Sequence, residues 1–252
     1  INYADPGRFE QSLTSKETMQ YIMIYTIGSV SIMLSSDGGR SFRPVAFSQA
    51  PVRGAVATPD MKTIRVYRCG SDNGKNPGNC ELHESTDYGE TFNMYVIGKA
   101  SSRQSGPKNS ISNLGPFIAS SDLSYTVAVW YGYTKCCVDY VSGAGLYYSV
   151  GRGTTFELLT IISESGSGNT AFGALRGIWG SYDLKNMLVV NQEGGMMKST
   201  NYGIAGSWVS ANPYGAPTGS TGYRAKGARM EYVTATEDMQ EDSRGYCLTS
   251  GL

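Results

Sequence analysis

Two arginines occupy the same place in two similar stretches of the sequence. Arg53 lies near the start of residues 52–62, and Arg176 lies near the start of their counterpart, residues 175–185. A planar guanidinium binds a carboxylate through two parallel hydrogen bonds, so converging arginines could hold an acidic group. The pattern indicates an anion-binding site with Arg53 and Arg176 as ligand-binding residues. The alternative is charge at a strand end, solvated or paired locally as surface charges commonly are.

Three tyrosines suit the recognition of a ligand. Tyr133 lies in the glycine-containing segment 132–145, and Tyr214 and Tyr223 lie in segment 210–226. A tyrosine side chain offers an apolar ring face and a hydroxyl together, which fits carbohydrate or protein surfaces. We predict that these tyrosines bind a ligand. The alternative is that both segments are ordinary connectors.

Residue types used in catalysis and metal binding are present without the spacing that such chemistry requires. His83 is the single histidine, so it cannot build a multi-histidine metal site, and a serine–histidine–aspartate triad would have to use it. Glu164 and Glu193 are possible acids with no distinctive spacing. Glu231 precedes Tyr232, but neighbours in a strand point to opposite faces. We predict no catalytic residue, no metal and no cofactor.

The cysteines favour an oxidising compartment. Cys69 and Cys80 flank a ten-residue segment between two expected strands, and partners across a hairpin mouth can satisfy disulfide geometry. A disulfide implies an extracellular, secreted or cell-surface location. Three further cysteines leave one thiol unpaired or paired outside the chain; they are Cys136, Cys137 and Cys247.

A phrase that recurs four times predicts the elements that must position these residues. Its pattern is Ser-x-Asp-x-Gly-x-Ser/Thr-aromatic, and the copies begin 50, 64 and 50 residues apart. Repeats at such a period indicate solenoids, propellers or arrays. The third copy lacks the Asp, and the fourth has Asn and two extra residues. The four copies are defined by Ser35, Asp37, Gly39 and Phe42; by Ser85, Asp87, Gly89 and Phe92; by Ser149, Gly153 and Phe156; and by Ser199, Asn201, Gly203 and Trp208.

Each copy lies between two short alternating apolar runs, as the turn of a hairpin does. The Asp or Asn side chain can accept hydrogen bonds from turn amides, and the Gly supplies a conformation that a Cβ would resist. The final aromatic ring can fill the apolar layer beneath the turn. We therefore expect these residues to be structural, with the four aromatic rings buried.

The repeat extends beyond the phrase. Strand-forming residues at 21–26, 64–68, 125–131 and 187–191 follow an acidic turn in each unit. We expect four complete four-stranded units and a fifth begun at about residue 227. In the fifth, an inner strand is expected at 230–235 and a second at 246–249. Either the first residues complete that unit or the chain is part of a longer protein.

The phrase resembles the Asp-box, or bacterial-neuraminidase repeat, of sialidases, sortilin-type receptors, some xyloglucan-cleaving glycosidases and many non-catalytic surface proteins. The resemblance implies an all-β fold: an Asp-box β-propeller of the sialidase/sortilin-like superfamily, with four complete four-stranded repeats and a partial fifth in one domain, 1–252. In such propellers the box lies between the third and fourth strands, away from the ligand-binding face. Sialidases grip their substrate with three arginines and use six blades. This sequence lacks their Phe/Tyr-Arg-Ile-Pro motif and has fewer repeats.

Composition excludes some classes of function. The formal net charge is zero and only 17% of the 252 residues are charged, which gives a nucleic-acid partner no support. No apolar run approaches membrane-spanning length. The chain begins at Ile1, which suggests a processed product or a fragment.

We expect a non-catalytic extracellular scaffold or recognition propeller that binds a protein or glycan partner through its long loops. The alternatives are a sialidase-like glycosidase and a subunit of a surface filament or shell. An enzyme should cluster carboxylates and arginines at one place. A lectin should repeat aromatic shelves on several blades, and an assembly subunit should present large interfaces.

Overall fold

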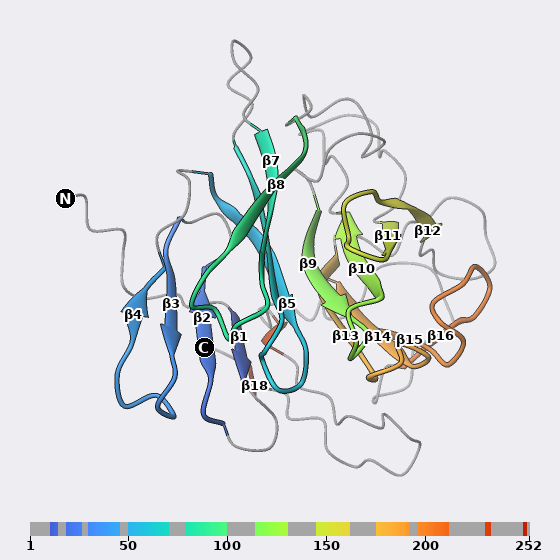
Figure 1. Cartoon of the computed structure of the whole chain (residues 1–252). Coiled ribbons are helices and arrows are strands. Elements are labelled where there is room, and N and C mark those ends of the chain that lie inside the picture. The colour runs from blue at the N-terminus through green and yellow to red at the C-terminus, as the bar shows by residue number, and fades with distance from the viewer. Residues whose placement is uncertain are drawn as a thin grey trace, which may run out of the picture. The chain divides into compact units, whose positions relative to one another are not determined.

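The described part of the chain is built from β-strands (Figure 1). A computed structural model describes residues 11–14, 19–26, 30–45, 50–70, 79–99, 114–130, 145–161, 175–191, 196–211, 230–232 and 249–250. Sixteen of the strands form four four-stranded antiparallel sheets, in each of which strands that are consecutive in the chain lie side by side. The described residues therefore form an all-β fold of the propeller class with four complete blades, as the repeated phrase predicts.

The strands of each blade fall where the repeat predicts them. The first blade comprises β1 (Gln11–Thr14), β2 (Ile22–Tyr25), β3 (Ile32–Ser35) and β4 (Arg43–Pro44). The second comprises β5 (Val52–Ala57), β6 (Ile64–Cys69), β7 (Asn79–Ser85) and β8 (Asn93–Lys99). The third comprises β9 (Leu114–Ala119), β10 (Tyr125–Trp130), β11 (Gly145–Val150) and β12 (Glu157–Ile161). The fourth comprises β13 (Leu175–Gly180), β14 (Met187–Asn191), β15 (Met196–Ser199) and β16 (Trp208–Ser210).

A fifth repeat begins after the fourth blade. Strands β17 (Met230–Tyr232) and β18 (Thr249–Ser250) pair antiparallel in a sheet of their own. The inner strand starts where the repeat places it, and the second overlaps its expected range only at Thr249 and continues to Ser250. The described residues of this repeat thus form two strands of a blade.

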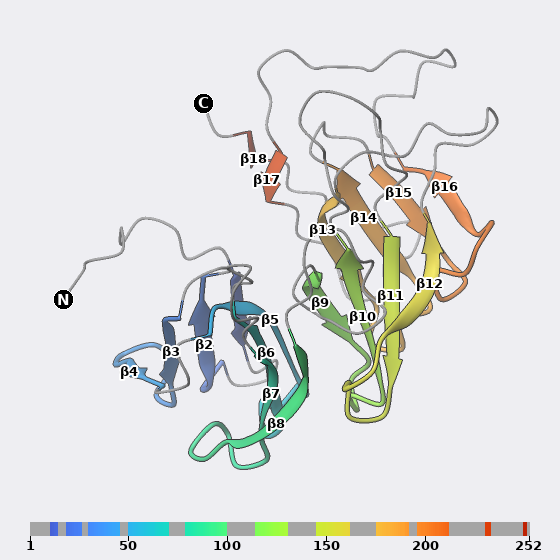
Figure 2. The same ribbon diagram turned by 90° about the horizontal axis from the view of Figure 1, so that it is seen from above.

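The chain divides into two compact units. One contains the first two blades together with residues 121–124 and 150–156, which carry two turns of the third blade. The other contains the rest of the third blade, the fourth blade and the pair β17–β18. Figure 2 shows the strands of each blade from a second direction.

Each unit has a core between two blades. In the first unit, buried side chains of the first blade pack against side chains of the second: Met23, Tyr25, Ile32 and Leu34 against Val52, Ala55, Ile64 and Val66. In the second unit, side chains of β10 and β11 pack against the fourth blade: Val127, Val129 and Leu146 against Leu175, Ile178, Met187 and Val189. The strands thus bury the β-branched and apolar residues that favour extended structure, and this burial stabilises the stacking of blades.

An acidic turn joins the first two strands of a blade and repeats the same geometry. Asp60 accepts hydrogen bonds from the Thr58 hydroxyl (2.6 Å) and the Lys62 amide (2.9 Å). The residue after the aspartate has a positive φ, 62° at Met61, 58° at Leu123 and 57° at Leu184, and each of these side chains is buried. Burial of a large apolar side chain offsets the strain of the left-handed backbone, which is uncommon for residues other than glycine.

Candidate functional site

The second box is held by its own serine and aspartate. The Ser85 hydroxyl accepts the Gly89 amide at 2.8 Å and donates to Asp87 at 2.7 Å. Asp87 also accepts the amide and the hydroxyl of Thr91, at 3.0 Å and 2.6 Å. The Thr91 and Ser85 hydrogen bonds lower the pKa of Asp87 to about 2. The carboxylate is therefore charged at neutral pH and serves the turn.

The first box repeats this arrangement. Asp37 accepts the Ser41 amide and hydroxyl at 2.9 Å and 2.6 Å, and the Ser35 hydroxyl accepts the Gly39 amide at 2.8 Å. The hydrogen bonds from Ser41, followed by that from Ser35, lower the pKa of Asp37 to about 2. Two boxes with the full sequence pattern thus have the same network of hydrogen bonds.

The fourth box keeps the serine and replaces the aspartate contacts. The Ser199 hydroxyl accepts the Gly203 amide at 3.1 Å and lies 2.7 Å from the Ser207 hydroxyl. Trp208 donates from its indole nitrogen to the Gly203 carbonyl at 3.0 Å. The two extra residues therefore lie within a turn that is still closed by its first serine and its terminal aromatic residue.

The third box is built differently. Gly151 occupies the position of the missing aspartate and has a φ of 73°. The Ser149 hydroxyl is buried and has no hydrogen-bond partner among the residues that the structure describes. The amide of Gly151 donates to the Ser124 carbonyl at 2.7 Å. Among the described residues, the box that lacks the aspartate thus also lacks the hydrogen bonds that the serine hydroxyl makes in the other boxes.

The aromatic rings that end the boxes differ in burial. Phe156 is buried and meets the Tyr67 ring edge-on, with ring centroids 5.8 Å apart. Phe92 and Trp208 are half-buried and pack against the cores of their units. Phe42 is 36% exposed, so the expectation that all four rings are buried is wrong. The Phe42 ring lies beside Gly39 of its own turn, but unlike Phe92 it does not pack against the core of the first unit.

A buried ion pair on the second blade reaches the third box. Arg65 of β6 donates from Nε to Glu84 of β7 at 2.9 Å, and both residues are buried. Arg65 also donates to the carbonyls of Leu123 (2.6 Å) and Gly151 (2.9 Å). Arg152 pairs with the second oxygen of Glu84 at 3.3 Å and lies 4.5 Å from the centroid of the Tyr95 ring. These charges are used within the fold, in hydrogen bonds and a cation–π contact.

A second charged cluster lies on the opposite face of the same strands. Glu81 of β7 pairs in register with Arg68 of β6, and its carboxylate lies 3.0 Å from His83 Nε2. Arg68 is fully buried and donates from Nε to the Ala50 carbonyl at 2.7 Å. Burial lowers the pKa of His83, and the hydrogen bond to Glu81 opposes that shift. Burial also lowers the pKa of Arg68, to about 10.

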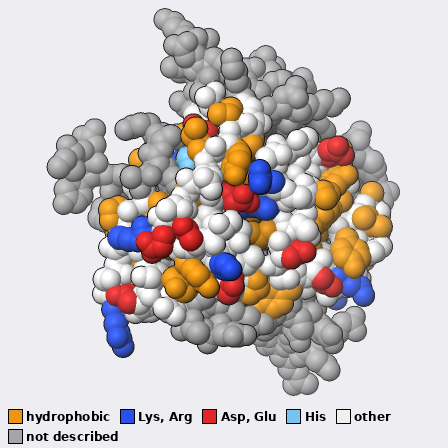
Figure 3. Space-filling view, viewed as in Figure 1, with side chains coloured by type: hydrophobic (Ala, Val, Ile, Leu, Met, Phe, Trp, Pro, Cys, Tyr) orange, Lys and Arg blue, Asp and Glu red, His pale blue; other side chains and the backbone are white. Residues whose placement is uncertain are grey.

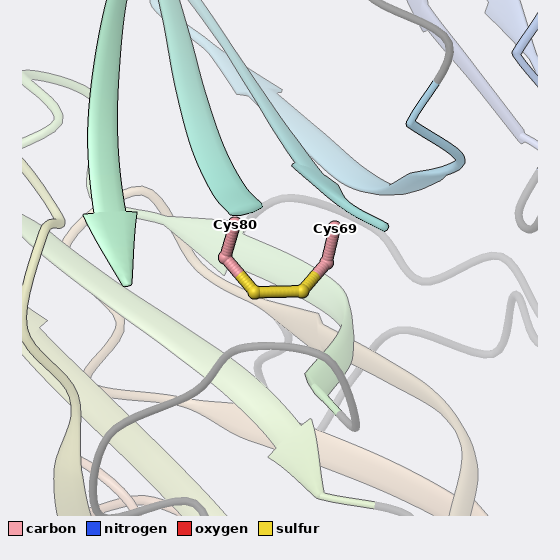
Figure 4. The surroundings of a disulfide bond; sticks show 2 residues. All are labelled: Cys69 and Cys80. Carbon is pink, nitrogen blue, oxygen red and sulfur yellow. A yellow bond between two sulfur atoms is a disulfide. The ribbon is translucent and has the colours of Figure 1, made fainter. Parts of the chain in front are cut away.

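The disulfide predicted from the sequence is present. Cys69 and Cys80 are register partners at the ends of β6 and β7, and their sulfurs are joined (Figure 4). Both side chains are fully buried. Because Ser85 starts the box at the other end of β7, the disulfide and the box lie at opposite ends of this blade.

The two predicted anion-binding arginines occupy equivalent bulges. The register between β5 and β6 shifts between Val52 and Gly54, and that between β13 and β14 shifts between Leu175 and Gly177. The extra residue is Arg53 in one blade and Arg176 in the other. Bulges of this kind re-aim a side chain and are common beside functional sites. Arg53 and its bulge belong to one unit, and Arg176 and its bulge belong to the other.

Several predicted site residues lie outside the described residues. These are Tyr133, Tyr214, Tyr223, Glu164 and Glu193. Glu231 is described in backbone only, at the register shift of β17. The prediction that the three tyrosines bind a ligand therefore stays a prediction.

A tyrosine–glutamate pair in the third blade was not predicted from the sequence. Tyr148 donates to Glu157 at 3.1 Å, and its ring stacks on Tyr125 with centroids 5.5 Å apart. The hydrogen bond and the negative charge of Glu157 raise the pKa of Tyr148. Tyr148 and Glu157 are register partners on β11 and β12, so the hydrogen bond joins two neighbouring strands of one sheet. We assign this pair to the stabilisation of the blade.

The described residues contain neither a metal-binding cluster nor a membrane-spanning helix. No group of three His, Cys, Asp or Glu side chains in this part of the chain is placed to hold a metal ion. No helix in the same residues has the length and apolarity to cross a membrane.

The box turns and the four-stranded blades define a β-propeller, and solved structures of that fold are similar to it. A GH74 enzyme of Niastella koreensis matches with a TM-score of 0.52 and 14% identity over 80% of this chain and 29% of its own. An ancestral GH74 enzyme matches with a TM-score of 0.49 and 12% identity over 81% and 25% of the two chains. YCF48 from Cyanidioschyzon merolae matches with a TM-score of 0.46 and 14% identity over 79% and 54%.

These similarities concern the fold. The chain spans less than a third of the length of the two GH74 chains. No family model matches the sequence, and no curated protein matches it. The activity of a structurally similar protein does not follow from a shared fold.

Proposed function

We propose that this protein is an extracellular, non-catalytic recognition propeller, which binds a glycan or protein partner at the blade ends opposite the boxes. The observation that carries the proposal is the Cys69–Cys80 disulfide. It closes the mouth of the segment between β6 and β7, at the end of the second blade farthest from the box. Disulfides persist in oxidising compartments, so the bond supports a secreted or cell-surface location.

The side-chain contacts at the box ends of the blades also support a binding site at the opposite ends. Asp37 and Asp87 accept hydrogen bonds within the turns that contain them, and Arg65 and Arg152 each pair with Glu84. Side chains engaged in this way stabilise the scaffold. Binding residues are commonly carried on loops that a rigid scaffold positions. Tyr133 lies in the sequence between β10 and β11, and Tyr214 and Tyr223 lie in the sequence between β16 and β17.

Glycan-array binding with matched variants tests the proposal. The wild-type chain is compared with a Tyr214→Ala, Tyr223→Ala double variant and with a Tyr133→Ala single variant. The control is a Tyr182→Ala, Tyr202→Ala double variant, because these tyrosines are 37% and 45% exposed in turns at the box end. A parallel screen against secreted and cell-surface proteins covers the protein-partner alternative.

We expect binding to fall in the Tyr133 and Tyr214/Tyr223 variants and to be retained in the Tyr182/Tyr202 control. Loss of binding in the control with retention in the other variants would place the partner at the box end and contradict the proposal. Thermal unfolding of each variant separates loss of binding from loss of folding.

A further inference from the structure

The first blade exposes an apolar side chain where the other three blades bury theirs. Met19 precedes β2 and has a φ of 48°, and the apolar residues at the same place in the later blades also have a positive φ. The Met19 side chain is 59% exposed, whereas its equivalents Met61, Leu123 and Leu184 are each 1% exposed. Equivalent residues of the repeat therefore have different surroundings in the first blade.

The same difference appears in the second strand of the blade. Ile22 of β2, Ile64 of β6 and Met187 of β14 each pair in register with the first serine of their own box, so they are equivalent. Ile64 and Met187 are buried, whereas Ile22 is half-buried. Ile24 lies two residues on, which places it on the same face of the sheet, and it is half-buried together with its register partner Met33.

In the second and fourth blades, this face of the sheet receives the blade before it. Met61 and Ile64 lie in one buried core with Leu34 of the first blade. Leu184 and Met187 lie in one buried core with residues of the third blade. The less buried residues of the first blade therefore lie on the face against which a preceding blade packs elsewhere in the molecule.

The aromatic residue of the first box belongs to the same face. Phe156 of the third box meets Tyr67 of the second blade edge-on, and Phe92 of the second box packs against the core that the second blade shares with the first. Each of these rings thus contacts the blade before its own. Phe42 and Ile22 both lie beside the glycine of the first box, and Phe42 is 36% exposed.

We propose that a further blade of the same polypeptide packs against the face of the first blade formed by Met19, Ile22, Ile24, Met33 and Phe42. All five side chains are apolar and uncharged, so a second apolar sheet face stabilises the contact by removing both surfaces from water. The surface viewed in Figure 3 differs from this face, because charged side chains lie there among apolar ones.

The repeat itself argues for a blade of the same polypeptide as the partner. The cores at the second and fourth blades each join two blades that follow one another in one chain. Beyond its four complete blades the chain also carries a fifth repeat, in which β17 pairs with β18. The covering blade should present an apolar sheet face, as the first blade does toward the second with Met23 and Leu34.

Oxidation of the methionines of the full chain by hydrogen peroxide tests the proposal, since a covered methionine reacts more slowly than an exposed one. Peptide mass spectrometry follows Met19, with Met94, which is 55% exposed, as the exposed reference and Met61 as the buried reference. An Ile22→Glu variant places a charge on the face. The matched control is Val209→Glu, at an exposed residue of the fourth blade. Measurements at about 1 µM and about 100 µM distinguish a blade of the same polypeptide from a separate molecule.

We expect Met19 of wild type and of Val209→Glu to oxidise about tenfold more slowly than Met94 at both concentrations, because a covered side chain reacts only when the blades separate locally. In Ile22→Glu, Met19 should react as fast as Met94, while Met61 stays protected and shows that the first two blades remain folded. Oxidation of wild-type Met19 at the rate of Met94 would overturn the proposal. Protection of Met19 that increases with protein concentration would assign the contact to another molecule and overturn it as well.

Discussion

Arg65 donates a hydrogen bond of 2.9 Å to the carbonyl oxygen of Gly151, the residue that replaces aspartate in the third box. The turn that lacks its own carboxylate is thus held by a guanidinium from the neighbouring blade. Glu84 of the adjacent strand β7 pairs with that guanidinium. Arg152 of the third box pairs with the other carboxylate oxygen of Glu84. In the third box, the hydrogen bond from Arg65 of β6 thus takes the place of the hydrogen bonds that Asp37 and Asp87 accept within the first two boxes.

Replacing Arg65 with Met should destabilise the protein by about 3 kcal/mol, because it removes one partner of a buried ion pair and leaves Glu84 with its exposed partner Arg152. Urea unfolding gives the change in the free energy of unfolding. A double-mutant cycle with Glu84→Gln then gives the coupling between the two side chains.

Arg43→Met is the matched control for Arg65. Arg43 also donates to a box carbonyl, that of Gly89 at 2.8 Å, and pairs with Glu90 at 3.2 Å, but both side chains are largely exposed. Exposed pairs contribute between about 0 and 1 kcal/mol. Equal losses in the two variants would show that the Arg65 network is no stronger than a surface ion pair.

Replacing Asp87 with Asn should lower the free energy of unfolding by about 1 kcal/mol, since it weakens hydrogen bonds to Thr91 in a partly exposed turn. The pKa of Asp87 is lowered from 3.8 to about 2. Its contribution is therefore present above pH 3.8 and lost as the pH falls toward 2. Chemical denaturation should show that the difference in free energy of unfolding between wild type and the Asp87→Asn variant is smaller at acidic pH than at pH 7. A difference that is independent of pH would contradict this prediction.

His83 should make stability fall in mildly acidic solution. Burial lowers its pKa below the ordinary value of 6.5, so in this range the unfolded chain binds a proton that the folded chain binds less readily. Stability should decrease as the pH falls through 6.5 and level off below the folded pKa. His83→Gln should flatten this dependence. The chain has one histidine, so its proton NMR titration measures the folded pKa directly; a value above 6.5 would refute the prediction.

Removing the Cys69–Cys80 disulfide should lower the free energy of unfolding by about 2–3 kcal/mol, because the bond closes a short loop in the unfolded chain. The Cys69→Ala, Cys80→Ala variant is compared with wild type by urea unfolding. Non-reducing peptide mapping of wild type should recover the two cysteines in one linked pair of peptides. Recovery of free thiols at both positions would rule out the bond in the native protein.

The sequence predicts the parts of the fold that depend on nearby residues. The first two boxes follow the pattern because each aspartate bonds a residue only four positions along the chain. Arg53 and Arg176 align in the sequence repeats, but the bulges that they occupy were not predicted from the sequence. The disulfide could be predicted because Cys69 and Cys80 flank one hairpin.

Interactions between distant residues could not be predicted in this way. Arg65 contacts carbonyls 58 and 86 positions away, and no local pattern marks it as their partner. The burial of the box aromatics was also mispredicted at Phe42. Its burial depends on what packs over the turn, which the motif does not specify.

The measurement that tests non-catalytic recognition most directly is hydrolysis of fluorogenic sialosides and β-glucosides by the full chain. An Arg53→Ala, Arg176→Ala variant serves as the control, since paired arginines could hold a substrate carboxylate. We predict the same background rate for both proteins. Turnover by wild type that the double variant abolishes would contradict the recognition function and establish a glycosidase.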